Sequence, residues 1–271
     1  MPFAWRISPQ TYAWRIRSAD PPDSDVPAFL KHGVADAVAA GYDGVEFGLS
    51  TFNRPGRVEA VKQLLSEDAL ALASVFATVN ASMSEAMLDE LVRQAEAPLS
   101  ANCTILNVAI QSQKIWDAES LHASVAVLNR LSEPLRTRAI QLCWHPHKEH
   151  FVAGCDGLLR VLEGALDCQV CLDLGWVALA GEDPVAVIGK CGSRIGYLHI
   201  RDLKGDSWTQ SVGTGVLDVP GICQALERIH YGGWMAVELW FDRSTEVTRP
   251  LAENAAASLA VLRSAMNNPP A

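Results

Sequence analysis

The sequence lacks several features that would place it in a familiar class of protein. Basic residues are in the minority: 22 Lys and Arg stand against 31 Asp and Glu, for a net charge of −9. Binding a nucleic-acid backbone requires clustered basic side chains. No apolar run is long enough for a signal peptide or a membrane span. We therefore expect a cytoplasmic protein with neither a nucleic acid nor a membrane as its main partner.

The cysteines do not form a recognisable framework either. There are seven, an odd number, and the single C-x-x-C of Cys168 and Cys171 has no second pair at zinc-ribbon spacing. Several of them, such as Cys103 and Cys143, lie within apolar runs. We interpret them as buried thiols that act as small hydrophobic side chains, which suits a reducing compartment.

What the sequence does contain is a regular alternation of strand and helix patterns. Short apolar runs predict eight strands, at residues 5–9, 44–48, 71–76, 104–109, 140–145, 169–173, 195–200 and 235–239. Segments with helical spacing follow them, at residues 26–40, 57–65, 84–95, 118–136, 156–166, 183–190, 219–229 and 251–266. Such an alternation implies parallel pairing, and eight units close a barrel. No linker-like run interrupts it, so we predict an α/β fold, a (β/α)8 TIM barrel, forming a single domain over residues 1–271.

Four of the predicted strands end on a side chain that can bind a metal ion. These side chains are His145, Asp173, His199 and Glu238. A parallel barrel gathers the carboxyl ends of its strands on one face, where TIM barrels keep their chemistry. Any one of these residues could instead cap a strand or a helix end, but four at equivalent positions favour a site. Two imidazoles and two carboxylates suit one divalent ion, such as Mn²⁺, Co²⁺, Zn²⁺ or Mg²⁺.

Further polar residues should face the same mouth. His147 shares the face of His145 and could hold substrate or carry a proton; the alternative is a solvated loop side chain. Arg201 could stabilise an enolate or bind a substrate anion, as could Lys204, although Lys204 is nearly as well explained as a solvated surface residue. Asp202 could accept a hydrogen bond from a ligand imidazole or contact a substrate hydroxyl.

Two features earlier and later in the chain leave alternatives open. Glu46 ends the second predicted strand and could orient a sugar hydroxyl, or it could pair with a loop arginine such as Arg54. Residues 213–215 read Gly-Thr-Gly, which is typical of a phosphate loop only in part, because no strand leads into it; a tight turn is the better interpretation.

The chain resembles the xylose-isomerase-like sugar isomerase and epimerase superfamily. The resemblance rests on A-G-Y-D-G-V-E at residues 40–46, W-H-P-H at 144–147, L-D-L-G-W at 172–176, L-H-I-R-D at 198–202, G-x-G-x-x-D at 213–218 and Y-G-G-W-x-x-V-E-L at 231–239. It covers most of the chain and is densest over residues 140–240. It implies a TIM barrel with one divalent metal held by residues of the second half of the barrel. By position, those ligands fall on His145, Asp173, His199 and Glu238.

Two departures from the family pattern bear on the reaction. His145 stands where many isomerases and epimerases have Glu, which removes one of the paired glutamates that epimerases use as acid and base. The motif W-H-P-H resembles the inosose dehydratase branch of the family more than its epimerases. Trp176 stands where relatives often have His, and it adds a stacking surface for a sugar ring, as Trp240 could.

The resemblance implies a reaction that begins with proton abstraction next to a carbonyl. Glu238 or a histidine, His145 among them, would be the base, and His147 the acid for a departing hydroxyl. The product would follow from isomerisation, epimerisation or dehydration of a sugar or keto-polyol, and the enzyme could form a homo-oligomer. Two other classes compete: a metal phosphodiesterase of the endonuclease IV type, for which seven histidines are few, and a non-catalytic sugar-binding subunit.

Overall fold

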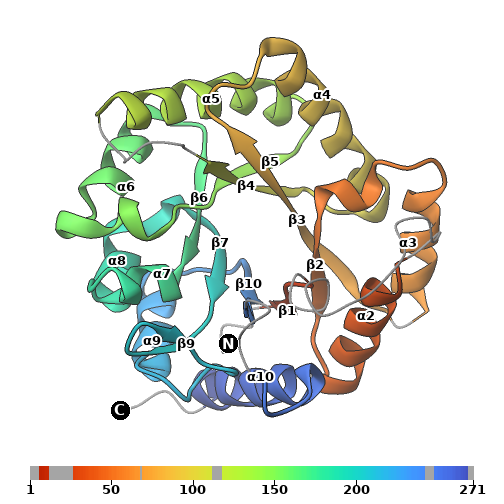
Figure 1. Ribbon diagram of the computed structural model, residues 1–271, viewed down its shortest axis with the longest axis vertical. Coiled ribbons are helices and arrows are strands. Elements are labelled where there is room, and N and C mark those ends of the chain that lie inside the picture. Colours follow the sequence, from red (N-terminus) through yellow and green to blue (C-terminus); the bar gives the residue numbers. More distant parts are fainter. Residues whose placement is uncertain (1–5, 12–26, 68, 112–117, 242–246, 268–271) are drawn as a thin grey trace.

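The chain folds into a parallel barrel surrounded by helices, as a computed structural model shows for residues 6–11, 27–67, 69–111, 118–241 and 247–267 (Figure 1). The barrel strands are β1 (Arg6–Pro9), β2 (Gly44–Gly48), β3 (Ala71–Asn80), β4 (Ile105–Gln111), β5 (Gln141–Trp144), β6 (Gln169–Asp173), β7 (Ile195–Ile200) and β10 (Trp234–Val237). Their order in the sheet is β1-β10-β7-β6-β5-β4-β3-β2, and a parallel bridge between Gln10 and Glu46 joins the two outer strands. The predicted (β/α)8 barrel is confirmed.

The helices lie on the outside of the barrel (Figure 1). They are α2 (Ala28–Ala40), α3 (Arg57–Ser66), α4 (Glu85–Glu96), α5 (Ala118–Arg136), α6 (Val152–Gly164), α7 (Leu174–Leu179), α8 (Pro184–Cys191), α9 (Val219–Arg228) and α10 (Leu251–Asn267). Short 3₁₀ turns occupy Leu49–Phe52, Ala97–Ala101, Lys148–His150 and Gly192–Arg194.

Local sequence signals explain where several helices begin and end. Asp183 and Asp218 accept hydrogen bonds from the first backbone amides of α8 and α9, the usual role of an N-cap residue. Gly41 ends α2 in the left-handed conformation, at φ 87°. Residues 153–155 of α6 are also left-handed, so its regular part begins near residue 156, where the sequence pattern places it.

Two elements escape the sequence pattern. The six-residue helix α7 directly follows Asp173, and a hairpin of β8 (Leu203–Lys204) and β9 (Ser207–Trp208) follows β7. Both are too short to show a clear hydrophobic period. The hairpin turns on Gly205, whose left-handed backbone (φ 62°) is what a two-residue hairpin loop requires.

The strands bury both of their faces. The larger apolar cluster fills the space between strands and helices, while a smaller one contains Cys143, Cys171, Tyr197 and Ala236. Because side chains two residues apart in a strand share a face, each of these four lies one layer below a predicted site residue: His145, Asp173, His199 and Glu238. The apolar layer is therefore the floor on which the polar site rests.

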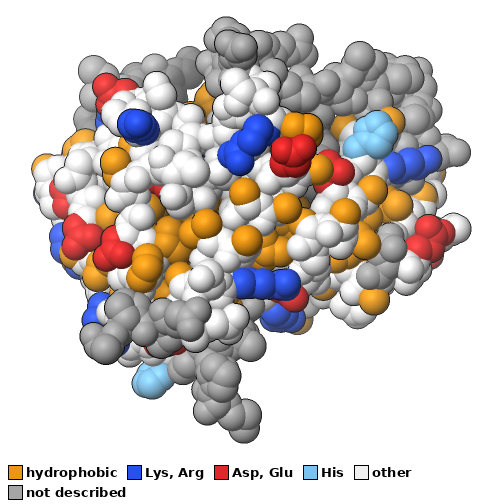
Figure 2. Space-filling model, turned by 90° about the horizontal axis from the view of Figure 1, so that it is seen from below, with side chains coloured by type: hydrophobic (Ala, Val, Ile, Leu, Met, Phe, Trp, Pro, Cys, Tyr) orange, Lys and Arg blue, Asp and Glu red, His pale blue; other side chains and the backbone are white. Residues whose placement is uncertain are grey.

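The remaining surface gives few further constraints. In the view of Figure 2, charged side chains of both signs are scattered among hydrophobic ones over the described part of that face. No helix within the described ranges is both long enough and apolar enough to cross a bilayer. All seven cysteines are buried and free of disulfides, as predicted.

Candidate active site

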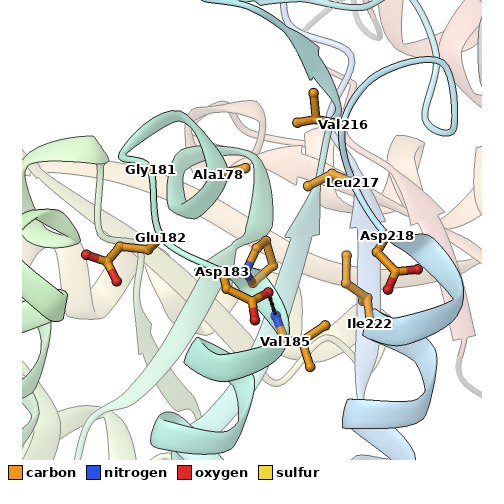
Figure 3. A pocket seen from close by; sticks show the side chains of 10 residues that line it. Ala178, Gly181, Glu182, Asp183, Val185, Val216, Leu217, Asp218 and Ile222 are labelled. Carbon is orange, nitrogen blue, oxygen red and sulfur yellow. Dashed lines mark hydrogen bonds between the residues drawn. The ribbon is translucent and has the colours of Figure 1, made fainter.

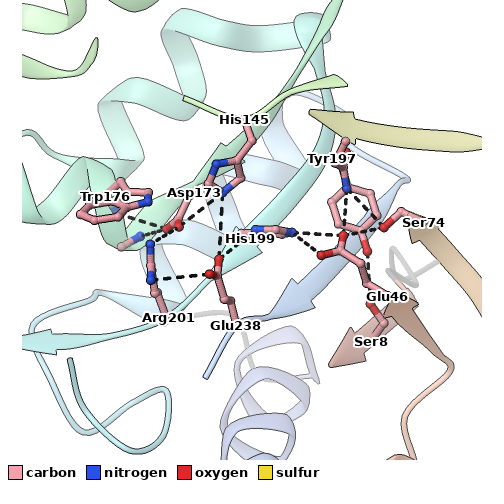
Figure 4. Close-up of polar contacts among 12 residues, drawn as sticks. Ser8, Glu46, Ser74, His145, Asp173, Trp176, Tyr197, His199, Arg201 and Glu238 are labelled. Carbon is pink, nitrogen blue, oxygen red and sulfur yellow. Dashed lines mark hydrogen bonds and ion pairs between the residues drawn. The ribbon is translucent and has the colours of Figure 1, made fainter. Parts of the chain in front are cut away.

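The four predicted ligands meet at the carboxyl end of the barrel (Figure 4). His145 Nε2 lies 3.7 Å from Asp173 Oδ2 and 4.0 Å from Glu238 Oε2, and His199 Nδ1 lies 3.0 Å from Glu238 Oε2. One donor atom from each residue lies within 4.8 Å of all the others. Two ligands at about 2.0–2.3 Å from one ion are themselves about 3–4.5 Å apart. The spacing of these side chains therefore fits a single ion.

Unsatisfied donors and the local charge also fit a divalent cation. His145 is 3% exposed, and neither of its ring nitrogens has a hydrogen-bond partner, which is unusual for buried polar atoms. Among the residues that the structure describes, the site has three buried carboxylates, on Glu46, Asp173 and Glu238, and one buried guanidinium, that of Arg201. A divalent ion bound beside neutral imidazoles would balance the two remaining negative charges.

Asp173 serves the site and the fold at once. Its Oδ1 accepts hydrogen bonds from the amides of Gly175 (2.8 Å) and Trp176 (3.1 Å) and so caps α7. Its Oδ2 lies 2.9 Å from Arg201 Nη2. Burial alone would raise the pKa of this carboxyl, but the positive charge of Arg201 and the contact with His145 hold it well below its usual range. Asp173 is thus ionised and fixed in orientation.

His199 lies between two carboxylates. Its Nδ1 faces Glu238, while its Nε2 lies 3.0 Å from Oε1 and 3.2 Å from Oε2 of Glu46. Burial opposes protonation, but these carboxylates and the Cys171 thiol raise the pKa of His199 well above its ordinary value. Burial likewise opposes ionisation of Glu46, yet His199, Ser74 and other partners lower its pKa to about 2.

Arg201 is clamped between two indole rings. Its guanidinium carbon lies 4.4 Å from the ring centre of Trp176 and 3.9 Å from that of Trp208, and Nη1 lies 3.6 Å from Glu238 Oε1. Stacking of this kind holds a guanidinium in place while leaving its N–H groups free to donate. Trp208 belongs to the hairpin and was not among the predicted residues. One face of the Trp176 ring lies against Arg201. The predicted stacking of a sugar on Trp176 would therefore have to use the other face of the ring.

His147 is not a solvated loop side chain. Its ring centre lies 5.1 Å from that of His145 and 5.5 Å from that of Trp176, and it is mostly buried. Burial, with the neighbouring His145, lowers the pKa of His147 to about 4. A proton on this imidazole is released readily but is present in only a small fraction of molecules near neutral pH.

Asp202 takes a position different from the predicted one. Its Oδ1 accepts from the amides of Leu203 (2.9 Å) and Leu217 (3.1 Å), and its Oδ2 from those of Gly213 (3.0 Å) and Gly215 (2.8 Å). The carboxylate thus organises the loop after the hairpin, and its contacts give no support to a role in holding substrate or a ligand imidazole. The turn at Gly213, with φ 85°, agrees with the tight-turn interpretation.

Three other features lie away from the four donors or at their margin. Lys204 is exposed, and Trp240 is partly exposed just beyond β10. A surface pocket of about 240 Å³ opens between the start of α8 and the start of α9 (Figure 3). Two acidic residues that line it, Asp183 and Asp218, already cap those helices. The third acidic residue that lines it, Glu182, accepts from the amide of Gly154 through Oε1.

The chain belongs to the family described as the xylose isomerase-like TIM barrel, whose model matches residues 34–265. It is similar to the inosose dehydratase of Bacillus velezensis, with 25% identity over 91% of each chain. It also matches the inosose dehydratase of Clostridium beijerinckii at 22% identity, over 81% of this chain and 85% of the relative.

Solved structures of sugar epimerases share the fold. An L-ribulose 3-epimerase superposes with a TM-score of 0.79 at 15% identity, covering 97% of this chain and 95% of its own. The D-allulose 3-epimerase of Methylomonas sp., in complex with D-allulose, gives 0.77 at 19% identity and covers 97% and 98%. At such identities the similarity concerns the fold alone.

Proposed function

We propose that this protein is a divalent-metal-dependent enzyme that removes a proton next to the carbonyl of a keto-polyol and eliminates water, in the manner of an inosose dehydratase. The strongest support is that His145, Asp173, His199 and Glu238 converge, and that neither ring nitrogen of His145 has a hydrogen-bond partner. The relatives of similar length are named inosose dehydratases, and His145 departs from the glutamate pair of epimerases.

The four side chains would hold the ion through one atom each. When bound, the ion supplies Lewis acidity, which makes the carbon beside a substrate carbonyl more acidic. Because Glu238 directs Oε2 toward both histidines, its Oε1 is the oxygen left to accept a proton. Burial would raise the pKa of Glu238, but Arg201 and His199 lower it, so the base is ionised before substrate arrives.

Arg201 and His147 complete the proposed assignment. Arg201 lies 3.6 Å from Glu238 Oε1, so its guanidinium is placed where the enolate left by proton removal would gather negative charge. His147 would deliver a proton to the β-hydroxyl that departs. The small fraction of protonated His147 predicts a rate that falls as the pH rises.

The two competing classes receive less support. The groups of described residues with metal-binding spacing all share His145 and His199, which corresponds to one centre, whereas the endonuclease IV type uses a cluster of ions. A non-catalytic sugar-binding subunit would not need the four donors to converge. Metal analysis of the purified protein separates that class from an enzyme.

The proposed reaction can be tested directly. The Mn²⁺-loaded protein is incubated in D₂O with keto-inositols and with ketoses, and exchange and product are followed by NMR. We expect deuterium exchange next to the carbonyl and an unsaturated ketone from a keto-inositol, both lost in Glu238→Gln. Robust epimerisation of a ketose with no unsaturated product would refute the dehydratase assignment, and absence of all exchange would refute the enzyme class.

A further inference from the structure

A carboxylate from the first half of the barrel contacts the far side of the candidate metal centre. Glu46, at the carboxyl end of β2, is 0% exposed and faces His199 from the side opposite Glu238 (Figure 4). We propose that Glu46 is a positioning residue that accepts the Nε2 proton of His199 and so directs the lone pair of Nδ1 toward the ion. This inference rests on the proposed metal centre.

The two nitrogens of His199 face different groups. Nδ1 lies 3.0 Å from Glu238 Oε2 and is therefore the atom on the ligand side. Nε2 lies 3.0 Å and 3.2 Å from the two oxygens of Glu46. Both nitrogens face a carboxylate at 3.0 Å, but Glu238 is itself a proposed ligand. With the ion bound by Nδ1 and Glu238, the single proton of a neutral imidazole lies on Nε2, where Glu46 accepts it. Carboxylates commonly fix the tautomer and ring orientation of a metal-binding histidine in this way.

Glu46 is itself fixed by neighbouring strands. Its Oε2 accepts hydrogen bonds from Ser74 Oγ (2.5 Å) on β3 and from Asn107 Nδ2 (2.9 Å) on β4. Asn107 Nδ2 also lies 3.2 Å from Ser74 Oγ, so the two donors support one another. Strand pairing places Glu46 directly opposite Ser74. A buried charge is costly unless it is paired. These hydrogen bonds hold Oε2, while Oε1 has His199 Nε2 at 3.0 Å as its ion-pair contact.

This arrangement replaces the expectation that Glu46 binds a sugar hydroxyl. The carboxylate has no exposed surface, and donors from Ser74, Asn107 and His199 surround it. Of the proposed ligands, it is His199 that Glu46 contacts, so we expect Glu46 to affect the centre through His199.

The test compares Glu46→Ala and Glu46→Gln with a matched control, Tyr42→Phe. Tyr42 is buried and its hydroxyl donates to the carbonyl of Ala255 (2.8 Å), so its replacement removes a buried hydrogen bond that involves neither Glu46 nor His199. Mn²⁺ affinity of the metal-free proteins is measured by calorimetry. The His199 tautomer is read from ring ¹⁵N chemical shifts in the Zn²⁺-loaded proteins.

We expect Glu46→Ala to bind Mn²⁺ about 10–100-fold more weakly than the wild type, as outer partners of metal ligands typically do. Its His199 should lose the defined Nε2–H signal. Glu46→Gln keeps an oxygen acceptor, so it should retain that signal and lose less affinity. Tyr42→Phe should match the wild type in both measurements.

Two results would overturn the inference: wild-type Mn²⁺ affinity in Glu46→Ala, or an unchanged Nε2–H signal in that variant. If Glu46→Ala does not fold, Glu46→Gln decides: a lost Nε2–H signal together with a Mn²⁺ affinity equal to that of Tyr42→Phe would show that the tautomer does not govern metal binding, and would contradict the role. A wild-type protein that binds no Mn²⁺ would instead refute the metal centre itself, which distinguishes the two failures.

Discussion

Asp173 offers a test in which its role in the fold and its role in the site can be separated. Its Oδ1 caps α7 and its Oδ2 faces Arg201 and His145. Asparagine at this position keeps an oxygen for the cap but removes the charge, whereas alanine removes both. The variants Asp173→Asn and Asp173→Ala should therefore differ in stability while sharing a defect in metal binding.

The expected magnitudes follow from the two contacts. Loss of an N-cap costs about 1 kcal/mol, within a range of about 0.5–2. For a protein of this size that corresponds to a melting temperature lower by about 2–4 °C in Asp173→Ala than in Asp173→Asn, without metal. Saturating metal at 100 times its dissociation constant should stabilise the wild type by about 2.7 kcal/mol. Both variants should lose most of this gain.

Differential scanning calorimetry with and without Mn²⁺ measures both effects. Equal melting temperatures of the two metal-free variants would show that Oδ1 does not stabilise α7. A full Mn²⁺-induced increase in the melting temperature of Asp173→Asn would show that this carboxylate is not a ligand. The wild type, measured with a chelator and then with Mn²⁺, supplies the reference for each comparison.

Three further predictions concern the site and the buried histidine His150 that follows β5. His145→Ala should chiefly weaken metal binding, whereas Glu238→Gln should reduce turnover even at saturating metal; equal turnover in Glu238→Gln would leave Glu238 as a ligand only. Trp208→Ala removes one of the two rings that hold Arg201 (3.9 Å). A lost cation–π contact of about 0.5–2 kcal/mol should raise the KM of a substrate that contacts the guanidinium by about 2–30-fold. An unchanged KM would show that Trp208 does not hold Arg201 in place. Burial lowers the pKa of His150 to about 3. Below about pH 6.5 the unfolded chain therefore binds a proton at this imidazole, whereas the folded chain does not. The free energy of unfolding should decrease as the pH falls from about 6.5 to 3, by at most about 1.4 kcal/mol per pH unit. Urea unfolding across this pH range measures the dependence of the unfolding free energy on pH, which should be weaker in His150→Asn. The same dependence in that variant and in the wild type would refute the role of His150.

The barrel and the four donors could be predicted because both depend on local pattern. An apolar run that ends on a polar, metal-binding side chain marks the carboxyl end of a strand, and parallel closure brings those ends together. His145 and Glu238 lie just beyond the observed ends of β5 and β10, yet their amides still donate to Val108 and Ile200 on neighbouring strands. The backbone hydrogen bonds therefore hold these side chains at the predicted level.

The parts that could not be predicted depend on register or on short elements. Ser74 and Asn107 are polar residues with apolar neighbours on both sides in their strands. Only the assembled barrel shows that they donate to Glu46. Trp208 lies in a two-residue strand, too short for any periodic signal. Asp202 lies just after β7, where a substrate-binding residue is expected, but its carboxylate accepts hydrogen bonds from four backbone amides.

The charge of the site bears on the choice of residue at position 145. Glu46, Asp173 and Glu238 contribute three buried negative charges, which Arg201 and one divalent ion would balance. A glutamate in place of His145 would add a fourth buried negative charge, which Arg201 and one divalent ion would not balance, and its cost would be large at this depth. A neutral histidine adds no charge and avoids that cost. The buried carboxylate of Glu46 therefore favours a neutral side chain at position 145 in the proposed centre.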